Sequence, residues 1–157
     1  MYKQIVVGTD GSPGANIAVD AAIELARLTG ATLHIVTARK VVNAFQLAGA
    51  AESGIAAVNI DEANSAVLAE GQQICAEVVE RAKQVGVQSE AHCIPGDAVD
   101  ALLRVVEDAH ADLLVVGNRG MSGARRFVLG SVPNKVSHHC PASLLIVDTS
   151  HAGETGG

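Results

Sequence analysis

The sequence predicts an α/β fold in which parallel strands alternate with helices in a doubly wound sheet. Short runs of Val, Leu and Ile alternate along the chain with segments whose apolar residues recur at helical spacing. Nearly half of the residues are apolar and only 2% are aromatic, a composition that suits parallel strands covered by helices on both faces. At 157 residues, we expect one domain over residues 1–148, followed by a disordered tail over 149–157.

The first strand is predicted at residues 4–7, where an apolar run ends in a turn that contains glycine and proline. Ser12 or Asp10 can cap the following helix, predicted over residues 15–28. Gly30 is expected to end that helix. The chain therefore opens as the first half of a β-α-β unit.

The second strand is predicted at residues 32–37, which are mostly β-branched. Residues 39–59 have no clear periodicity, and we expect a mobile excursion with some helical turns and no assigned role. A long helix is predicted over residues 60–85, ended by Gly86. The third strand follows at residues 87–94, where polar and apolar residues alternate.

The remaining elements are a helix at 98–110, a strand at 113–116, a helix at 132–139 and a strand at 143–148. Strands that alternate with helices in this way indicate parallel pairing through right-handed crossovers. Periodicity alone does not give the order of the strands in the sheet.

Composition excludes several classes of function. A net charge of −6 argues against a general nucleic-acid surface. No apolar run approaches the length of about 20 residues that a membrane span needs, and the start of the chain does not read as a secretory leader. The three cysteines are widely spaced and are expected to be reduced: Cys75, Cys93 and Cys140. The expected location is the cytosol.

The stretch after the fourth strand has the parts of an anion-binding site. The strand ends at Gly117, residues 118–129 contain three arginines and no acidic residue, and Gly130 and Ser131 open the next helix. Ser131 is predicted as the N-cap of that helix. Glycines let backbone N–H groups approach a phosphate, and a helix N-terminus offers unpaired donors and a positive dipole. The sequence therefore predicts a phosphate-binding loop.

The spacing decides which kind of loop this is. A Walker loop needs Lys before the Ser or Thr, but Gly130 precedes Ser131, and the dinucleotide pattern Gly-x-Gly-x-x-Gly is missing. Gly117, Gly120, Gly130 and Ser131 form the pattern Gly-x2-Gly-x9-Gly-Ser, which matches the ATP-binding signature of the universal stress protein family. The chain resembles this family over residues 5–147. The resemblance implies a Rossmann-like domain of the adenine nucleotide α-hydrolase-like class, with five parallel strands in order 3-2-1-4-5 and four helices.

In that order, the first and fourth strands flank the switch point of the sheet, where open α/β sheets bind ligands. The resemblance implies that Gly8, Thr9 and Asp10 line the adenine and ribose end, with Asp10 as the main polar contact to the base. Asp10 can equally be a turn or capping residue, and the two roles are compatible. Val36 matches the apolar wall beside the adenine, and it would be a core residue in any case.

The same resemblance implies that Val116 and Gly117 pass close to the ribose and that Gly120 lets the backbone approach the phosphates. Three loop arginines can neutralise phosphate charge or can remain solvated: Arg119, Arg125 and Arg126.

The outer phosphates are expected to receive N–H donors from Gly130, Ser131 and Val132, together with the Ser131 hydroxyl. Pro133 departs from the family pattern, because proline has no N–H and removes one possible donor. A bound Mg²⁺ or Mn²⁺ would be held through phosphate oxygens, since no carboxylate cluster lies near the loop in sequence.

No metal site made by protein side chains and no catalytic machinery is predicted. His138 and His139 are adjacent on a helix and point in different directions, and three other histidines are scattered and receive no role: His34, His92 and His110. No nucleophile elbow or nucleophile–base pair is recognisable.

The leading hypothesis is therefore a universal stress protein that binds ATP as a regulatory ligand in the stress response. Three alternatives stay open: a member that binds cyclic AMP, a slow ATPase or nucleotidyl transferase, and an interaction module that binds no nucleotide. The resemblance also implies a homodimer through the fifth strand at residues 143–148, and exposed edges permit higher oligomers.

Overall fold

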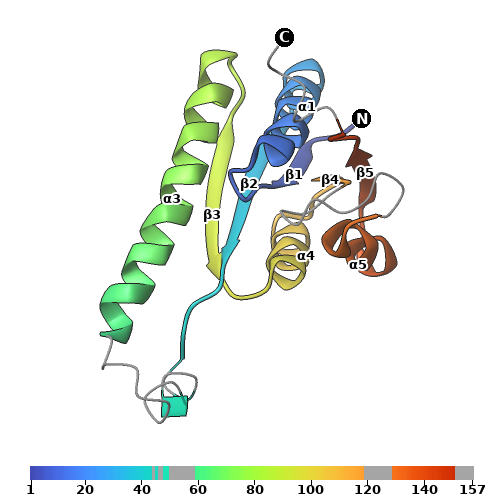
Figure 1. Ribbon diagram of the computed structural model, residues 1–157. Helices are drawn as coiled ribbons and strands as arrows, with labels where there is room; N and C mark the ends of the chain where they lie inside the picture. Colours follow the sequence, from blue (N-terminus) through green and yellow to red (C-terminus); the bar gives the residue numbers. More distant parts are fainter. Residues whose placement is uncertain (44, 46–47, 50–58, 119–128, 151–157) are drawn as a thin grey trace.

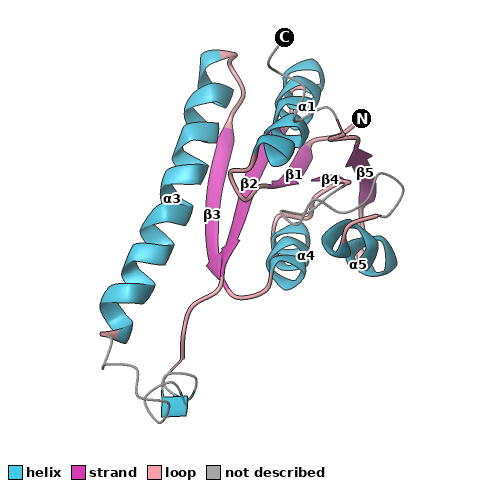
Figure 2. Cartoon of the chain, in the orientation of Figure 1, coloured by secondary structure: helices cyan, strands magenta, loops and turns pink. Residues whose placement is uncertain are grey.

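A computed structural model of the chain describes residues 1–43, 45, 48–49, 59–118 and 129–150. In this part of the chain, five strands alternate with four helices of nine residues or more (Figure 2). In chain order the elements are β1 (Gln4–Gly8), α1 (Pro13–Thr29), β2 (Thr32–Arg39), α3 (Ile60–Gln84), β3 (Ser89–Pro95), α4 (Ala98–Asp108), β4 (Leu113–Gly117), α5 (Ser131–His139) and β5 (Ser143–Val147).

The strands form one parallel sheet in the order β3-β2-β1-β4-β5, which confirms the predicted order. Helices α1 and α3 cover one face of the sheet, and α4 and α5 cover the other (Figure 1). β1 and β4 are neighbours at the centre, so the chain winds outward from them in both directions. This pairing is the switch point of a doubly wound fold.

Side-chain alternation along each strand divides the core in two. Ile5 and Val7 of β1 are fully buried under α1 and α3, whereas Val6 is buried under α4 and α5. On β2, Ile35 belongs to the first core and Val36 to the second. Because both faces are covered, the strands are apolar at consecutive positions, as the sequence shows.

The predicted helix boundaries follow from caps that the structure contains. The Ser12 side chain accepts the N–H of Ala15 at the start of α1, and Pro13 occupies the first turn. Gly30 ends α1 with a φ of 71°, the left-handed conformation that glycine adopts without steric cost. Of the two candidate caps, Ser12 and Asp10, the structure selects Ser12, and it confirms Gly30 as the end; the helix starts at Pro13 instead of residue 15.

The predicted N-cap of α5 is wrong by one residue. Gly130 has the extended conformation of the cap, and Ser131 is already the first helical residue. Glycine has no side chain, so no side-chain hydrogen bond caps the first turn of α5. The first N–H groups of a helix have no partner within the helix. The α5 N-terminus is therefore the one among the four helices that lacks a side-chain cap in the described residues.

Two other expectations need correction or lie outside the described residues. β5 ends at Val147 rather than at residue 148. Thr149, assigned to a disordered tail, is only 4% exposed and is hydrogen-bonded to Asn118; residues 151–157 are outside the described part. Most of the predicted excursion at 39–59 is outside it as well. No helix in the described part combines the length and apolar character needed to cross a membrane.

Asp112 joins the starting ends of the central strands. Its carboxylate accepts the backbone N–H groups of Lys3 and Gln4 at 2.7 and 2.8 Å. Its own N–H donates to the Gln4 carbonyl, and its carbonyl accepts from Ser143. The hydrogen bonds that the carboxylate accepts from these two N–H groups lower the pKa of the Asp112 carboxyl below its usual value, and they do so more than any nearby charge.

This geometry predicts a pH-dependent contribution to stability. Because the pKa of Asp112 is lowered in the folded state, its contribution is complete above the ordinary carboxyl pKa and is lost as pH falls through the lowered folded value. Asp112→Asn should reduce the free energy of unfolding at pH 7 by about 1 kcal/mol. Urea unfolding should show that the deficit shrinks toward about pH 3. Glu107→Gln, at an exposed position, is the control, and an equal, pH-independent deficit in both variants would contradict the assignment.

Candidate functional site

A cleft opens at the carboxyl ends of β1 and β4, on the face that α4 and α5 cover. It contains about 650 Å³ of empty space, part of it open to solvent. Residues from the strand ends, from the loop after β1 and from three helices line it: Gly8, Thr9, Asp10, Ala15, Val36, Ala38, Ala98, Leu102, Val116, Gly117, Val132 and Pro133. The cleft therefore lies at the switch point, where ligands bind in open α/β sheets.

The loop after β1 is held by hydrogen bonds to β2. The N–H of Thr9 donates to the Val36 carbonyl at 2.9 Å, and the Thr37 hydroxyl donates to the Thr9 carbonyl. The Thr9 hydroxyl in turn accepts the N–H of Gly11 at 3.1 Å. Thr9 and Thr37 are both buried, so this part of the cleft wall is rigidly positioned before any ligand enters.

Asp10 is the one ionisable side chain among the described residues that line the cleft. Its Oδ1 accepts the N–H of Ser12 at 2.9 Å, which makes Asp10 a turn residue. A carboxylate has a second oxygen and spare lone pairs. The turn role therefore leaves Asp10 able to accept a hydrogen bond from a ligand.

One end of the cleft is an apolar slot between β2, β4 and α4. Gly8 forms its floor, because a Cβ built on Gly8 would lie 3.0 Å from Cδ2 of Leu102. Val36 and Val116 are buried beside it, and Ala38 and Leu102 complete the slot. A flat apolar group fits such a lining better than a charged one.

The other end of the cleft is formed by the start of α5. Val132 and Pro133 line the cleft, and they follow directly on Gly130 and Ser131, the residues at the uncapped N-terminus. Ser131 is exposed and Gly130 is buried. The N–H groups of this first turn and the positive end of the helix dipole make this end of the cleft suited to an anion.

Asn118 connects the two halves of this site, and the sequence did not single it out. Its carbonyl accepts the N–H of Gly130 at 2.9 Å, and its N–H donates to the Val147 carbonyl. Its side-chain oxygen accepts the N–H and the hydroxyl of Thr149 at 3.0 and 2.7 Å, while Nδ2 donates to Asp148. Asn118 thereby holds the N-terminus of α5 against the ends of β4 and β5.

The structure brings most of the predicted site residues together. Seven of them line the cleft: Gly8, Thr9, Asp10, Val36, Val116, Gly117 and Val132. Gly130 and Ser131 stand at the adjoining start of α5 without being among the lining residues. Four predicted loop residues lie outside the described part of the chain: Arg119, Gly120, Arg125 and Arg126.

Four lining residues were missed in the sequence: Ala15, Ala38, Ala98 and Leu102. Each is a small or aliphatic residue inside a predicted element or at its edge, and nothing in its local sequence distinguishes it from a core residue. For Ala98 alone the sequence offered a clue, because it follows the helix cap Asp97. In this fold, a helix that follows a strand begins at the edge of the sheet where ligands bind.

Comparison with known proteins gives the same assignment at the level of family. The family model described as "Universal stress protein family" matches residues 1–148. The chain is 35% identical to universal stress protein YxiE of Bacillus subtilis (strain 168) over 149 residues, covering 94% of this chain and 99% of that protein. It is 37% identical to universal stress protein Rv1636 of Mycobacterium tuberculosis (strain ATCC 25618 / H37Rv) over 151 residues, covering 95% and 98%.

Among solved structures, a universal stress protein in complex with cAMP superimposes with a TM-score of 0.70 at 33% identity, covering 95% of this chain and 99% of that one. The fold, the matched family model and these two near-complete sequence relationships agree. The chain belongs to the universal stress protein family.

Proposed function

We propose that the chain binds an adenine nucleotide in the cleft at the switch point, with ATP as a regulatory ligand whose occupancy is passed to partners in a stress response. The observation that carries this proposal is the polarity of the cleft, which has an apolar slot at one end and an uncapped helix N-terminus at the other. An adenine nucleotide has the same division between a flat base and charged phosphates.

Shape and hydrogen bonding suit one end of the cleft to the adenine base. The slot between Val36, Ala38 and Leu102 has no charged side chain among its described lining residues, so the apolar faces of a purine can pack against it. Asp10 already accepts one backbone N–H. Its remaining lone pairs can accept the base amino group or a ribose hydroxyl.

Unpaired hydrogen-bond donors suit the other end of the cleft to the phosphates. The N–H groups of Ser131 and Val132 belong to the first turn of α5, which has no side-chain cap. Gly130 was expected to be a third backbone donor, but its N–H is already donated to the Asn118 carbonyl at 2.9 Å. Pro133 contributes no N–H, so the N–H groups of Ser131 and Val132 and the Ser131 hydroxyl remain for an anion. Arg119, Gly120, Arg125 and Arg126 belong to the same proposal on the basis of the sequence signature. A Mg²⁺ or Mn²⁺ ion would be carried in by the phosphates.

Cyclic AMP is the second candidate ligand. The related structure at 33% identity contains cAMP, and a cyclic nucleotide needs fewer phosphate donors than ATP does. The loss of one donor at Pro133 is compatible with either ligand. A cytosolic location, expected from the sequence, stays a prediction.

The nucleotide released on denaturing freshly purified protein tests the proposal and distinguishes its versions. Wild type should release ATP, detected by mass spectrometry. Ala98→Leu fills the cleft beside Leu102 and should reduce both the released nucleotide and the affinity in calorimetry about tenfold or more. Ala76→Leu, on the exposed side of α3, is the matched control.

Each outcome of this experiment has a defined meaning. Release of cAMP would replace ATP by the second candidate at the same site, and ADP with free phosphate would indicate hydrolysis. A wild-type protein that carries no nucleotide and binds none when titrated would overturn the proposal, leaving the interaction module as the better account.

Ser131→Asp tests the phosphate end separately. An acidic residue in the first turn suits the helix dipole, so the melting temperature should hold or rise slightly, while repulsion weakens ATP binding about tenfold or more. Adenosine has no phosphate, and its affinity should stay unchanged. Gln72→Glu adds the same charge on the exposed side of α3 and serves as control. Equal losses for ATP and adenosine would show that the phosphates lie elsewhere.

We further propose that two chains pair through β5, which lies at one edge of the sheet. The N–H of Ser143 donates to the carbonyl of Asp112, just before β4, and the Val147 carbonyl accepts the N–H of Asn118, just after β4. Alternation along a strand then turns the backbone groups of Leu144 and Ile146 outward. These outward groups are the unpaired edge that a second copy can use.

Leu144→Pro removes one outward N–H and spares the pairing with β4, because proline is tolerated at the solvent side of an edge strand. Sedimentation equilibrium should show wild-type dimers and a variant whose dissociation constant is raised about tenfold or more. A folded variant that dimerises like wild type, or a monomeric wild type, would contradict pairing through β5.

A further inference from the structure

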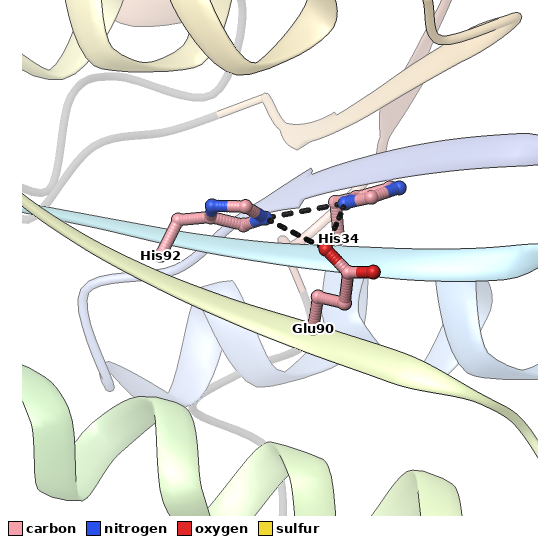
Figure 3. A group of neighbouring side chains, drawn as sticks. All are labelled: His34, Glu90 and His92. Atoms are coloured by element: carbon pink, nitrogen blue, oxygen red, sulfur yellow. Dashed lines mark hydrogen bonds and ion pairs between the residues drawn. The ribbon is translucent and has the colours of Figure 1, made fainter. Parts of the chain in front are cut away.

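Two histidines and a glutamate that are far apart in sequence meet on the sheet face under α4. His34 lies on β2, and Glu90 and His92 lie on β3 (Figure 3). The strand register places His34 opposite Glu90 and Val36 opposite His92. Alternate residues of a strand share one face, so this register puts all three side chains on the same side of the sheet.

The potential ligand atoms converge on one point. His34 Nδ1 lies 3.2 Å from His92 Nε2 and 3.7 Å from Glu90 Oε2, and the last two atoms are 4.0 Å apart. Figure 3 shows both rings and the carboxylate turned toward one another. A point equidistant from the three atoms lies about 2.1 Å from each, which is the length of a Zn–N or Zn–O bond.

The separations also favour one coordination geometry. Bonds of this length put ligand atoms about 3.4 Å apart at tetrahedral angles and about 3.0 Å apart on an octahedral face. The observed distances, 3.2, 3.7 and 4.0 Å, are nearer the tetrahedral spacing than the octahedral one. They put the equidistant point in the plane of the three atoms, so a fourth ligand requires the exposed Glu90 carboxylate to move slightly inward. Two imidazoles and one carboxylate are a ligand set that Zn²⁺ takes with a water in the fourth position.

Gln4 prepares His34 for this role. His34 Nε2 lies 2.8 Å from Gln4 Oε1, and an amide oxygen can only accept, so Nε2 is the protonated nitrogen. The Nδ1 lone pair then points at the other two ligands.

The group borders a hollow between β3 and α4 that gives access from solvent. Arg104 and Asp108 of α4 also line it, and they form an exposed pair at 3.7 Å. His34 is 5% exposed, whereas the Glu90 side chain is 64% exposed. A metal ion could therefore enter past Glu90 and be held against the buried ring.

We propose that His34, Glu90 and His92 form a binding site for a divalent transition-metal ion, with Zn²⁺ as the ion favoured by ligand type and spacing and a water molecule as its fourth ligand. The site joins the edge strand β3 to β2. It lies apart from the nucleotide cleft, with which it shares no lining residue among those described, and it does not depend on the proposed function.

The test uses the full chain, treated with EDTA, freed of chelator and titrated with Zn²⁺ alone in a calorimeter. Wild type should bind one ion per chain, and Co²⁺ should give the intense visible absorption of a four-coordinate site. His92→Gln and Glu90→Gln should each weaken Zn²⁺ binding about tenfold or more, and Gln4→Leu should weaken it through loss of orientation. His110→Gln and Glu80→Gln, both at exposed positions, should bind as wild type does.

Circular dichroism and melting temperature without metal establish that each variant is folded, and Zn²⁺ should raise the melting temperature of wild type more than that of His92→Gln. The proposal is overturned if wild type binds no Zn²⁺. It is equally overturned if folded His92→Gln and Glu90→Gln bind Zn²⁺ as wild type does, or if a His138→Gln/His139→Gln variant is the one that loses the ion. The last result would identify adventitious binding at the end of α5.

Discussion

The parallel pairing of β1 with β4 is the contact on which the rest of the structure depends. It brings together the ends of two strands that are separated by more than 100 residues in sequence, and it divides the helices between the two faces. Because the chain leaves this pair in opposite directions, no crossover covers the carboxyl ends of β1 and β4. The cleft is a direct result of this topology. Asp112 holds the opposite ends of the same strands in register.

The cleft combines two physical features that arise independently. Its apolar end comes from strand and helix side chains that also form the core, such as Val36 and Leu102. Its polar end comes from backbone N–H groups that α5 itself leaves unpaired. Asn118 holds the start of α5 through its backbone, and its side chain accepts hydrogen bonds from Thr149 after β5. Among its described lining residues, the site has one ionisable side chain, the carboxylate of Asp10.

The features predicted correctly from the sequence are those determined by local residue patterns. Apolar runs located the strands, Gly30 located the end of α1, and Ser12 was one of the two residues proposed as its N-cap. The N-cap of α5 was misplaced because glycine and serine both occupy that position well, and only the backbone conformation distinguishes Gly130 from Ser131. Asn118 and the histidine group were missed for a different reason. Their partners depend on the register between strands, as with His34 and His92, and register has no local signal.

The two edges of the sheet differ, and this difference bears on how many chains could join by strand pairing. The β3 edge carries an exposed Glu90 and finishes at Pro95, which has no N–H, while the long helix α3 lies along it (Figure 1). The β5 edge is short and aliphatic. Charge and proline discourage further strand addition. Pairing of β5 with its own copy about a twofold axis consumes both matching edges and leaves two β3 edges outside. Such an arrangement closes on itself, so strand addition would stop at the pair instead of growing into a filament.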